Sequence, residues 1–191
     1  MSGFHELPAD LPVPTDDGAA DPLAGTRLPA LVLPSTAGEL DLATAGRARL
    51  VLYIYPRTGV PGVPLPAGWD RIPGARGCTP ESCGFRDHEA ELRGLGASLL
   101  GLSAQPLEEQ REFAERELIP YPLISDPELR LAGELGLPTF EVEGTRLYKR
   151  LTLLAERGAI VHAFYPVFPP DAHAAEVVAW LRDEARAGPG R

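Results

Sequence analysis

The residues of this chain best suited to chemistry are its two cysteines, Cys78 and Cys83. Two cysteines this close together in a protein of a reducing compartment are more often catalytic or metal-binding than a structural disulfide. Thr79, Pro80 and Glu81 follow Cys78 and are typical of a helix start, with Thr79 as the N-cap residue. We therefore expect Cys78 just before a helix N-terminus, where free N–H groups favour the thiolate and lower the pKa of the thiol.

The spacing of the two cysteines limits how they can bond. Five residues along a helix separate two Cα atoms by roughly 8.6 Å, whereas a disulfide requires Cα atoms within about 7 Å. A bond between Cys78 and Cys83 would therefore require the first turns of the helix to unwind. Asp87 and His88 are further ligand types nearby, but helical spacing spreads these four residues around the axis. We predict neither a metal site from them nor a cofactor.

The surrounding periodicity predicts the elements that position Cys78. Residues 49–55, RLVLYIY, form an apolar run typical of a strand buried on both faces. A long loop rich in proline and glycine, about residues 57–76, leads from this strand to the helix. Strand and helix patterns alternate after it, and the segments 147–154 and 160–164 predict an antiparallel hairpin.

This order of elements predicts an α/β protein with a thioredoxin-like fold, in which helices flank a central mixed sheet. A strand, a turn and a short strand within residues 28–42 predict an N-terminal β-hairpin extension. We divide the chain into a flexible N-terminal arm, residues 1–26, and a single domain, residues 27–187, which carries the long loop.

Charge and hydropathy exclude several partners. The formal net charge is −9, so the chain has no electrostatic reason to approach phosphate backbones or anionic lipid. No apolar run is long enough to span a bilayer, and residues 1–21 lack the basic start and apolar stretch of a secretory signal. We expect no nucleic-acid or membrane partner, and a cytoplasmic location.

The sequence around the cysteines resembles the peroxiredoxins. Tyr55-Pro56 and the segment from Gly77 to Asp87, GCTPESCGFRD, are most similar to the bacterioferritin-comigratory, or peroxiredoxin Q, branch. The likeness extends over about residues 28–185. Its other segments are Gly101-Leu102-Ser103, Phe113-Ala114-Glu115, residues 121–127 (YPLISDP) and residues 150–154 (RLTLL).

The resemblance implies a thiol-dependent peroxidase for hydrogen peroxide and organic hydroperoxides. Cys78 would attack the peroxide and become a sulfenic acid, Cys83 would condense with it to an intramolecular disulfide, and thioredoxin or a similar dithiol would reduce that disulfide. Arg150 and backbone N–H groups would stabilise the charge on the peroxide. A resolving cysteine in the same chain implies a monomer. A peroxide-sensing thiol switch or adaptor with low turnover would use the same pair, and this alternative stays open.

One departure from the family pattern lies between the buried strand and Cys78. The family has threonine or serine three residues before the peroxidatic cysteine, where this chain has Ala75, and the segment after Pro56 carries an insertion. Thr58 has the only hydroxyl between Pro56 and Cys78, so we predict that it hydrogen-bonds the peroxide. The insertion would either line a channel for an organic peroxide or be a rigid surface decoration. The residues that would line such a channel are Val60, Val63, Leu65 and Trp69.

Overall fold

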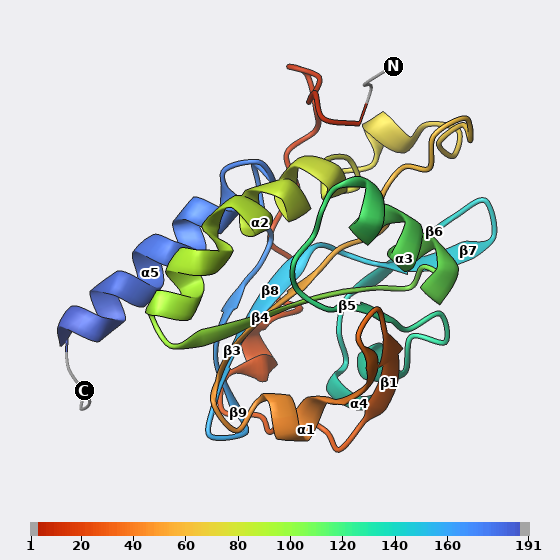
Figure 1. The fold of residues 1–191 in the computed structure, drawn as a ribbon. Coiled ribbons are helices and arrows are strands. Elements are labelled where there is room, and N and C mark those ends of the chain that lie inside the picture. The colour runs from red at the N-terminus through yellow and green to blue at the C-terminus, as the bar shows by residue number, and fades with distance from the viewer. Residues whose placement is uncertain (1–3, 188–191) are drawn as a thin grey trace.

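The computed structural model of the protein describes residues 4–187 (Figure 1). Seven strands of this part of the chain form one mixed sheet: β1 (Val32–Ser35), β2 (Gly38–Asp41), β3 (Arg49–Ile54), β4 (Ala97–Ser103), β5 (Leu123–Ser125), β8 (Leu151–Glu156) and β9 (Ala159–Phe164). Their order across the sheet is β2-β1-β5-β4-β3-β8-β9. Strands β3, β4 and β5 run parallel, whereas β8 is antiparallel to β3, and β9 is antiparallel to β8.

The central strand β3 is the apolar run that the sequence predicts as a buried strand. Leu50 to Ile54 are fully buried. Because successive side chains of a strand point to opposite faces, Leu52 joins the apolar core on one side of the sheet, and Val51 and Tyr53 join the core on the other. The two cores explain why residues 50–54 include no charged residue.

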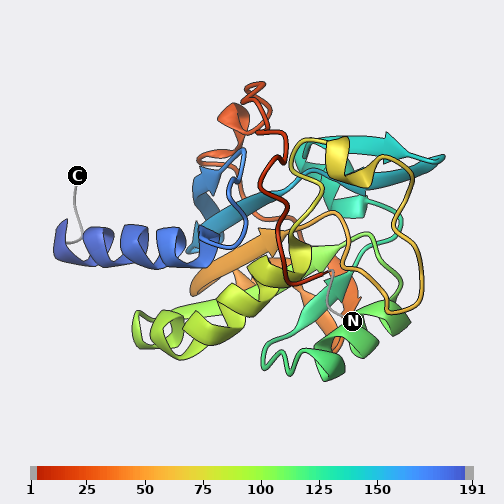
Figure 2. The same ribbon diagram turned by 90° about the horizontal axis from the view of Figure 1, so that it is seen from above.

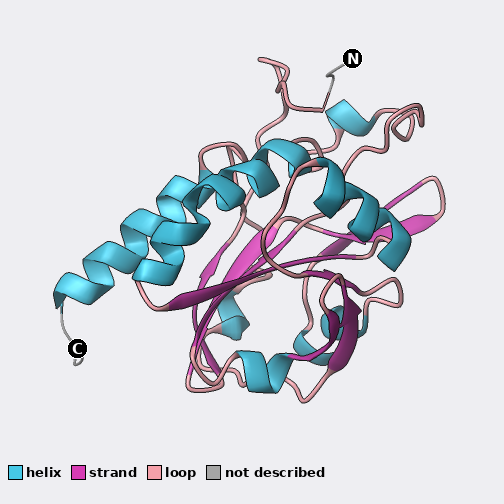
Figure 3. Ribbon diagram, viewed as in Figure 1, coloured by secondary structure: helices cyan, strands magenta, loops and turns pink. Residues whose placement is uncertain are grey.

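Helices cover both faces of the sheet (Figures 1 and 3). One face carries α2, α3 and α5, of which α2 and α5 lie side by side (Figures 1 and 2). The other carries the shorter α1 and α4. This is the predicted thioredoxin-like arrangement, with hairpin β1–β2 as its N-terminal extension. No helix within residues 4–187 is long and apolar enough to cross a membrane. The helices are α1 (Leu42–Ala45), α2 (Cys78–Gly94), α3 (Leu107–Arg116), α4 (Arg130–Leu135) and α5 (His173–Ala187).

A second hairpin, β6 (Thr139–Val142) with β7 (Thr145–Tyr148), is absent from the sequence prediction. The predicted strand 147–154 is in fact two strands, because Tyr148 pairs with Thr139 while pairing with β3 begins at Leu151. Glu143 and Gly144 make the turn with φ of 49° and 75°, the conformation of a tight hairpin. Glutamate rarely adopts a positive φ, so the dipeptide is a weak signal.

The N-terminal segment is packed against the domain where the structure describes it, although its composition predicts a flexible arm. Leu23 is buried in the core beside α1, and the carboxylate of Asp17 accepts hydrogen bonds from Lys149 and Tyr165 at 2.7 and 2.8 Å. Near its start, Phe4 lies against the backbone of Gly59. The arm therefore crosses the end of the molecule at which α2 begins (Figure 2).

Candidate active site

Cys78 is the first residue of α2, not the residue before it. The N-cap is Gly77, with φ of 104°, so Thr79 is the second residue of the helix and not its cap. Only glycine adopts this conformation readily, and a Cβ at Gly77 would also lie 2.3 Å from Pro170. The helix cap therefore lies two residues before the predicted Thr79 cap, and Cys78 lies inside the protein with 3% of the residue exposed.

Arg150 lies directly before β8 and reaches the sulfur of Cys78. Its Nη2 is 3.1 Å from Cys78 Sγ, and the guanidinium is buried. The guanidinium also donates to the carbonyl oxygens of Gly74 and Arg76 at 3.3 and 3.1 Å. The last residues of the long loop thus fix the orientation of Arg150 toward the sulfur.

Glu81 completes a buried cluster with Cys78 and Arg150. Its place in the sequence indicates only an acidic residue in the first turn of the helix. It lies three residues after Cys78, on the same face of α2, and is fully buried. Its Oε2 forms an ion pair with Nη1 of Arg150, while Oε1 has no hydrogen-bond partner among the described residues. The i, i+3 spacing from Cys78 is the signal that identifies it. One guanidinium therefore bridges the carboxylate and the sulfur.

Burial reverses the expected direction of the Cys78 pKa shift. Loss of solvent raises the pKa of the thiol, Arg150 lowers it and the carboxylate of Glu81 raises it, and the result is a raised pKa. The backbone N–H of Arg57 faces the sulfur and also lowers the pKa. The sequence argument for a lowered pKa assumes an open helix end, whereas this sulfur is buried, and burial disfavours the charged form. Arg150 is the group that opposes this cost most strongly.

Thr58 follows Arg57, whose backbone N–H faces the Cys78 sulfur, and Thr58 is hydrogen-bonded to Gln105. The side-chain Oε1 of Gln105 accepts from the backbone N–H of Thr58 at 2.7 Å and from its hydroxyl at 3.1 Å. Both residues are buried. The role of Thr58 in binding peroxide stays a prediction. Gln105 holds the Thr58 side chain in place, and no motif in the sequence indicates this role.

Cys83 is a free thiol on the second turn of α2, as is Cys78 at its start. The helix between them is unbroken, so the structure holds the form in which the spacing forbids a disulfide. Cys83 is 8% exposed, and its Sγ lies 3.6 Å from Oε2 of Glu117, at the C-terminal end of α3. Burial raises the pKa of Cys83 to about 11. In this form Cys83 is therefore a thiol near neutral pH.

The sulfur of Cys78 borders a small hollow of about 10 Å³. Leu65 and Trp69 of the long loop line it together with Phe4 of the N-terminal segment. Trp69 is anchored by packing against Phe140. Val63 is exposed, so only part of the loop's apolar set faces the site.

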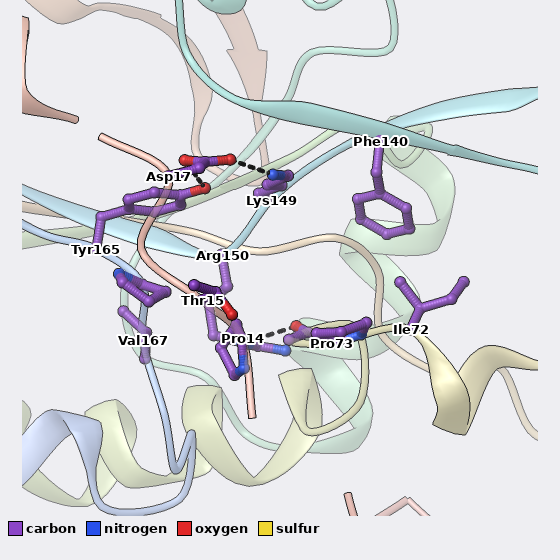
Figure 4. A pocket seen from close by; sticks show the side chains of 12 residues that line it. Pro14, Thr15, Asp17, Ile72, Pro73, Phe140, Lys149, Arg150, Tyr165 and Val167 are labelled. Atoms are coloured by element: carbon purple, nitrogen blue, oxygen red, sulfur yellow. Dashed lines mark hydrogen bonds and ion pairs between the residues drawn. The ribbon is translucent and has the colours of Figure 1, made fainter. Parts of the chain in front are cut away.

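A larger cavity of about 400 Å³ lies beside Arg150 (Figure 4). Pro14, Ile72 and Phe140 give it apolar walls, and the linked side chains of Asp17, Lys149 and Tyr165 form a polar end. The N-terminal segment therefore forms walls of both hollows that adjoin the Cys78–Arg150 pair.

The chain is similar over most of its length to known proteins. The Redoxin family model matches residues 23–179. A putative peroxiredoxin bcp of Coxiella burnetii is 29% identical over 161 residues, which cover 82% of this chain and 97% of that protein. The crystal structure of peroxidoxin BcpB from Mycobacterium tuberculosis superposes with a TM-score of 0.67 and 29% identity, covering 84% of this chain and 96% of its own. A structure of the Xanthomonas campestris bacterioferritin comigratory protein shares the fold, with a TM-score of 0.64, 24% identity and coverage of 94% and 100%.

A buried cysteine at a helix N-terminus in this fold, together with these matches, places the chain in the Redoxin family. Within it, the chain belongs to the bacterioferritin comigratory protein, or peroxiredoxin Q, branch. It is a thiol-dependent peroxidase.

Proposed function

We propose that Cys78 is the nucleophile that reduces the peroxide. The observation that carries this proposal is the contact of 3.1 Å between Arg150 Nη2 and Cys78 Sγ at the start of α2. The Cys78 thiolate attacks one peroxide oxygen, the O–O bond breaks, and its electron pair leaves with the second oxygen, which takes a proton to become water or an alcohol. Cys78 is oxidised to a sulfenic acid, and the peroxide is reduced. Arg150 and the backbone N–H of Arg57 lie where negative charge develops on the oxygens.

Cys83 is our candidate for the resolving cysteine. Its thiolate attacks the sulfenic sulfur of Cys78, the S–S bond forms as the S–O bond breaks, and the departing hydroxide takes a proton from solvent to become water. Because an intact α2 holds the two Cα atoms too far apart, the turns of α2 from residue 79 to about residue 86 must unwind first. Cys83 must also separate from Glu117, to which it hydrogen-bonds in the dithiol form.

The partners we propose follow from this cycle. The substrate is hydrogen peroxide or an alkyl hydroperoxide, and the apolar side chains of Phe4, Leu65 and Trp69 at the hollow beside Cys78 favour an alkyl group. The related Xanthomonas campestris protein is described for alkyl peroxide reduction. Thioredoxin or a similar dithiol reduces the disulfide. The protein works as a monomer, since both cysteines lie in one chain. Its location is the cytoplasm. Thr58 would bind the peroxide by exchanging its hydrogen bond with Gln105.

A coupled assay tests the whole cycle. Purified protein is mixed with thioredoxin, thioredoxin reductase and NADPH, and NADPH loss is followed after addition of hydrogen peroxide or cumene hydroperoxide. We expect loss with both peroxides and faster turnover with the organic one. Peroxide consumption in a single turnover, without catalytic NADPH loss, would support the low-turnover thiol switch instead.

Replacing Cys83 by serine is expected to stop the cycle after one turnover. The variant should consume one equivalent of peroxide and hold a sulfenic acid on Cys78, because serine cannot form the disulfide. Mass spectrometry after dimedone labelling would detect the trapped sulfenic acid, and the coupled assay would show no sustained NADPH loss. Normal turnover of this variant with thioredoxin alone would assign resolution to another thiol.

Gly84→Ala is expected to slow disulfide formation about fivefold. Gly84 lies inside α2, and an added Cβ would meet Ala174 of α5 at 3.5 Å, an ordinary contact. Alanine favours a helix over glycine by about 1 kcal/mol, which is roughly a factor of five in the unwound population. Slower resolution should leave more sulfinic acid at high peroxide, as measured by mass spectrometry.

Gly94→Ala is the matched control for this prediction. Gly94 is the last residue of the same helix, and an added Cβ there meets nothing within 4 Å. It lies outside the turns that must unwind, so disulfide formation should keep the wild-type rate.

Hydrogen exchange of residues 79–86 should be faster in the disulfide form than in the dithiol form. Equal protection in both forms would refute the unwinding step.

A further inference from the structure

Three side chains from separate parts of the chain meet beside α2. They are Cys83 of α2, Glu117 at the end of α3, and His5 of the N-terminal segment. Oε2 of Glu117 lies 3.6 Å from Cys83 Sγ and 3.3 Å from His5 Nε2, and all three atoms lie within 4.8 Å of one another. Cys83 and Glu117 are buried, whereas His5 is exposed. The cluster is thus a thiol, a carboxylate and an imidazole gathered at one point and open to solvent on the imidazole side.

The spacing of these donor atoms is that of neighbouring ligands around zinc. Tetrahedral zinc with bonds of about 2.3 Å to sulfur and about 2.0–2.2 Å to nitrogen and oxygen holds adjacent ligand atoms about 3.3–3.6 Å apart. Two edges of the cluster have these lengths, and the third, from His5 to Cys83, is below 4.8 Å. Thiolate, imidazole and carboxylate are also the donor types that zinc takes in proteins.

We propose that His5, Cys83 and Glu117 form a zinc-binding site with a fourth position open to water. On binding, the S–H bond of Cys83 breaks, its proton goes to solvent, and the thiolate sulfur bonds the ion. The ligand atoms of His5 and Glu117 are Nε2 and Oε2, with His5 neutral. This set differs from the cysteine, aspartate and histidine positions on α2 that helical spacing rules out.

The neighbouring charges suit a carboxylate ligand with one free oxygen. Oε1 of Glu117 is paired with Arg116, which orients the group, so Oε2 faces Cys83 and His5. Arg86 donates to the backbone oxygen of Glu117 and is itself paired with Asp87. Binding replaces the thiol proton of Cys83 by the ion, so it releases a proton to solvent.

Zinc at this site would inhibit disulfide formation between Cys83 and Cys78, a consequence that rests on the proposed role of Cys83. A metal-bound sulfur has its electron pair engaged and cannot attack the sulfenic sulfur. The ion also ties α2 to α3 and to the N-terminal segment, which opposes the unwinding of α2 from residue 79 to about residue 86. Phe4, next to His5, would at the same time be held over the hollow at Cys78.

Metal titration of the reduced full chain tests the site without peroxide. Cobalt(II) is added as the spectroscopic probe, then displaced by zinc. We expect one equivalent to bind, with a sulfur-to-cobalt charge-transfer band and the visible bands of a four-coordinate ion. Cys83→Ser should remove the charge-transfer band, and His5→Gln should weaken binding at least about tenfold. Cys78→Ser and His88→Gln are the matched controls and should bind as the wild type does.

Either of two results would overturn the site: no binding at one equivalent, or a band that Cys78→Ser removes and Cys83→Ser keeps. His5→Gln affects an exposed residue, so its effect reports ligation and not folding. A second measurement then follows disulfide formation after one equivalent of peroxide with and without zinc. Zinc should slow it in the wild type and not in His5→Gln. Binding without this slowing would leave the metal site intact and reject Cys83 as the resolving thiol.

Discussion

Cys78→Ser is expected to abolish peroxide consumption, down to the rate of the uncatalysed reaction, while the fold survives. Serine is almost the same size as cysteine, so the buried position at the start of α2 is filled without a cavity. A hydroxyl is far less acidic than a thiol, and its oxygen cannot form the sulfenic acid that begins the cycle. Peroxide loss measured directly, without any reductant, checks the chemical step alone.

Cys83→Ser is the matched control for this loss, because it keeps the Cys78 thiol and should still consume one equivalent of peroxide. Circular dichroism and the thermal midpoint of Cys78→Ser should stay close to those of the wild type. Near-normal peroxide consumption by Cys78→Ser would remove Cys78 from the mechanism, and with it the proposed function.

Arg150→Met is expected to slow the reaction with peroxide by about 10²–10³-fold, the usual effect of removing one donor to a developing anion. Arg150 contacts the Cys78 sulfur at 3.1 Å and lowers the pKa of the thiol, so its loss should also raise that pKa further. The single change leaves the carboxylate of Glu81 buried without its partner, which costs about 3–5 kcal/mol of stability. The double variant Glu81→Gln/Arg150→Met removes both charges and preserves the fold for kinetics.

The two charges predict opposite pKa changes, which separates their roles. The Glu81 carboxylate raises the pKa of Cys78, so Glu81→Gln alone should lower it, whereas Arg150→Met should raise it. Thiolate absorbance against pH, measured in the Cys83→Ser background, records a single thiol. Arg76→Met is the control, because Arg76 also lies near the helix start but pairs with Asp70. A full effect from Arg76 and none from Arg150 would reverse the assignment.

Local sequence patterns determine much of this protein. The strand 49–54, the helix after Cys78 and its end at the glycines 94 and 96 follow from residues that are neighbours in the chain. The close pair Cys78 and Cys83 and the RLTLL segment that begins at Arg150 are likewise read directly. Helical geometry alone excludes a disulfide between the cysteines while α2 is intact, and the structure has both thiols free. These features depend on residues that are close neighbours in the chain, so the sequence alone predicts them.

Tertiary structure decided the chemistry around the sulfur, because contacts between distant residues depend on packing and not on local periodicity. Arg150 is the residue directly before β8, and its pairing with Glu81 makes that acidic residue of the first helical turn part of a buried charge cluster. Burial of Cys78 by the loop and the N-terminal segment reverses the pKa shift that an open helix end would give. The same packing brings His5 to Cys83 and Glu117, although these residues lie up to 112 positions apart in the sequence. A polar arm without periodicity carries no signal of where it docks, so only the folded chain could place it there.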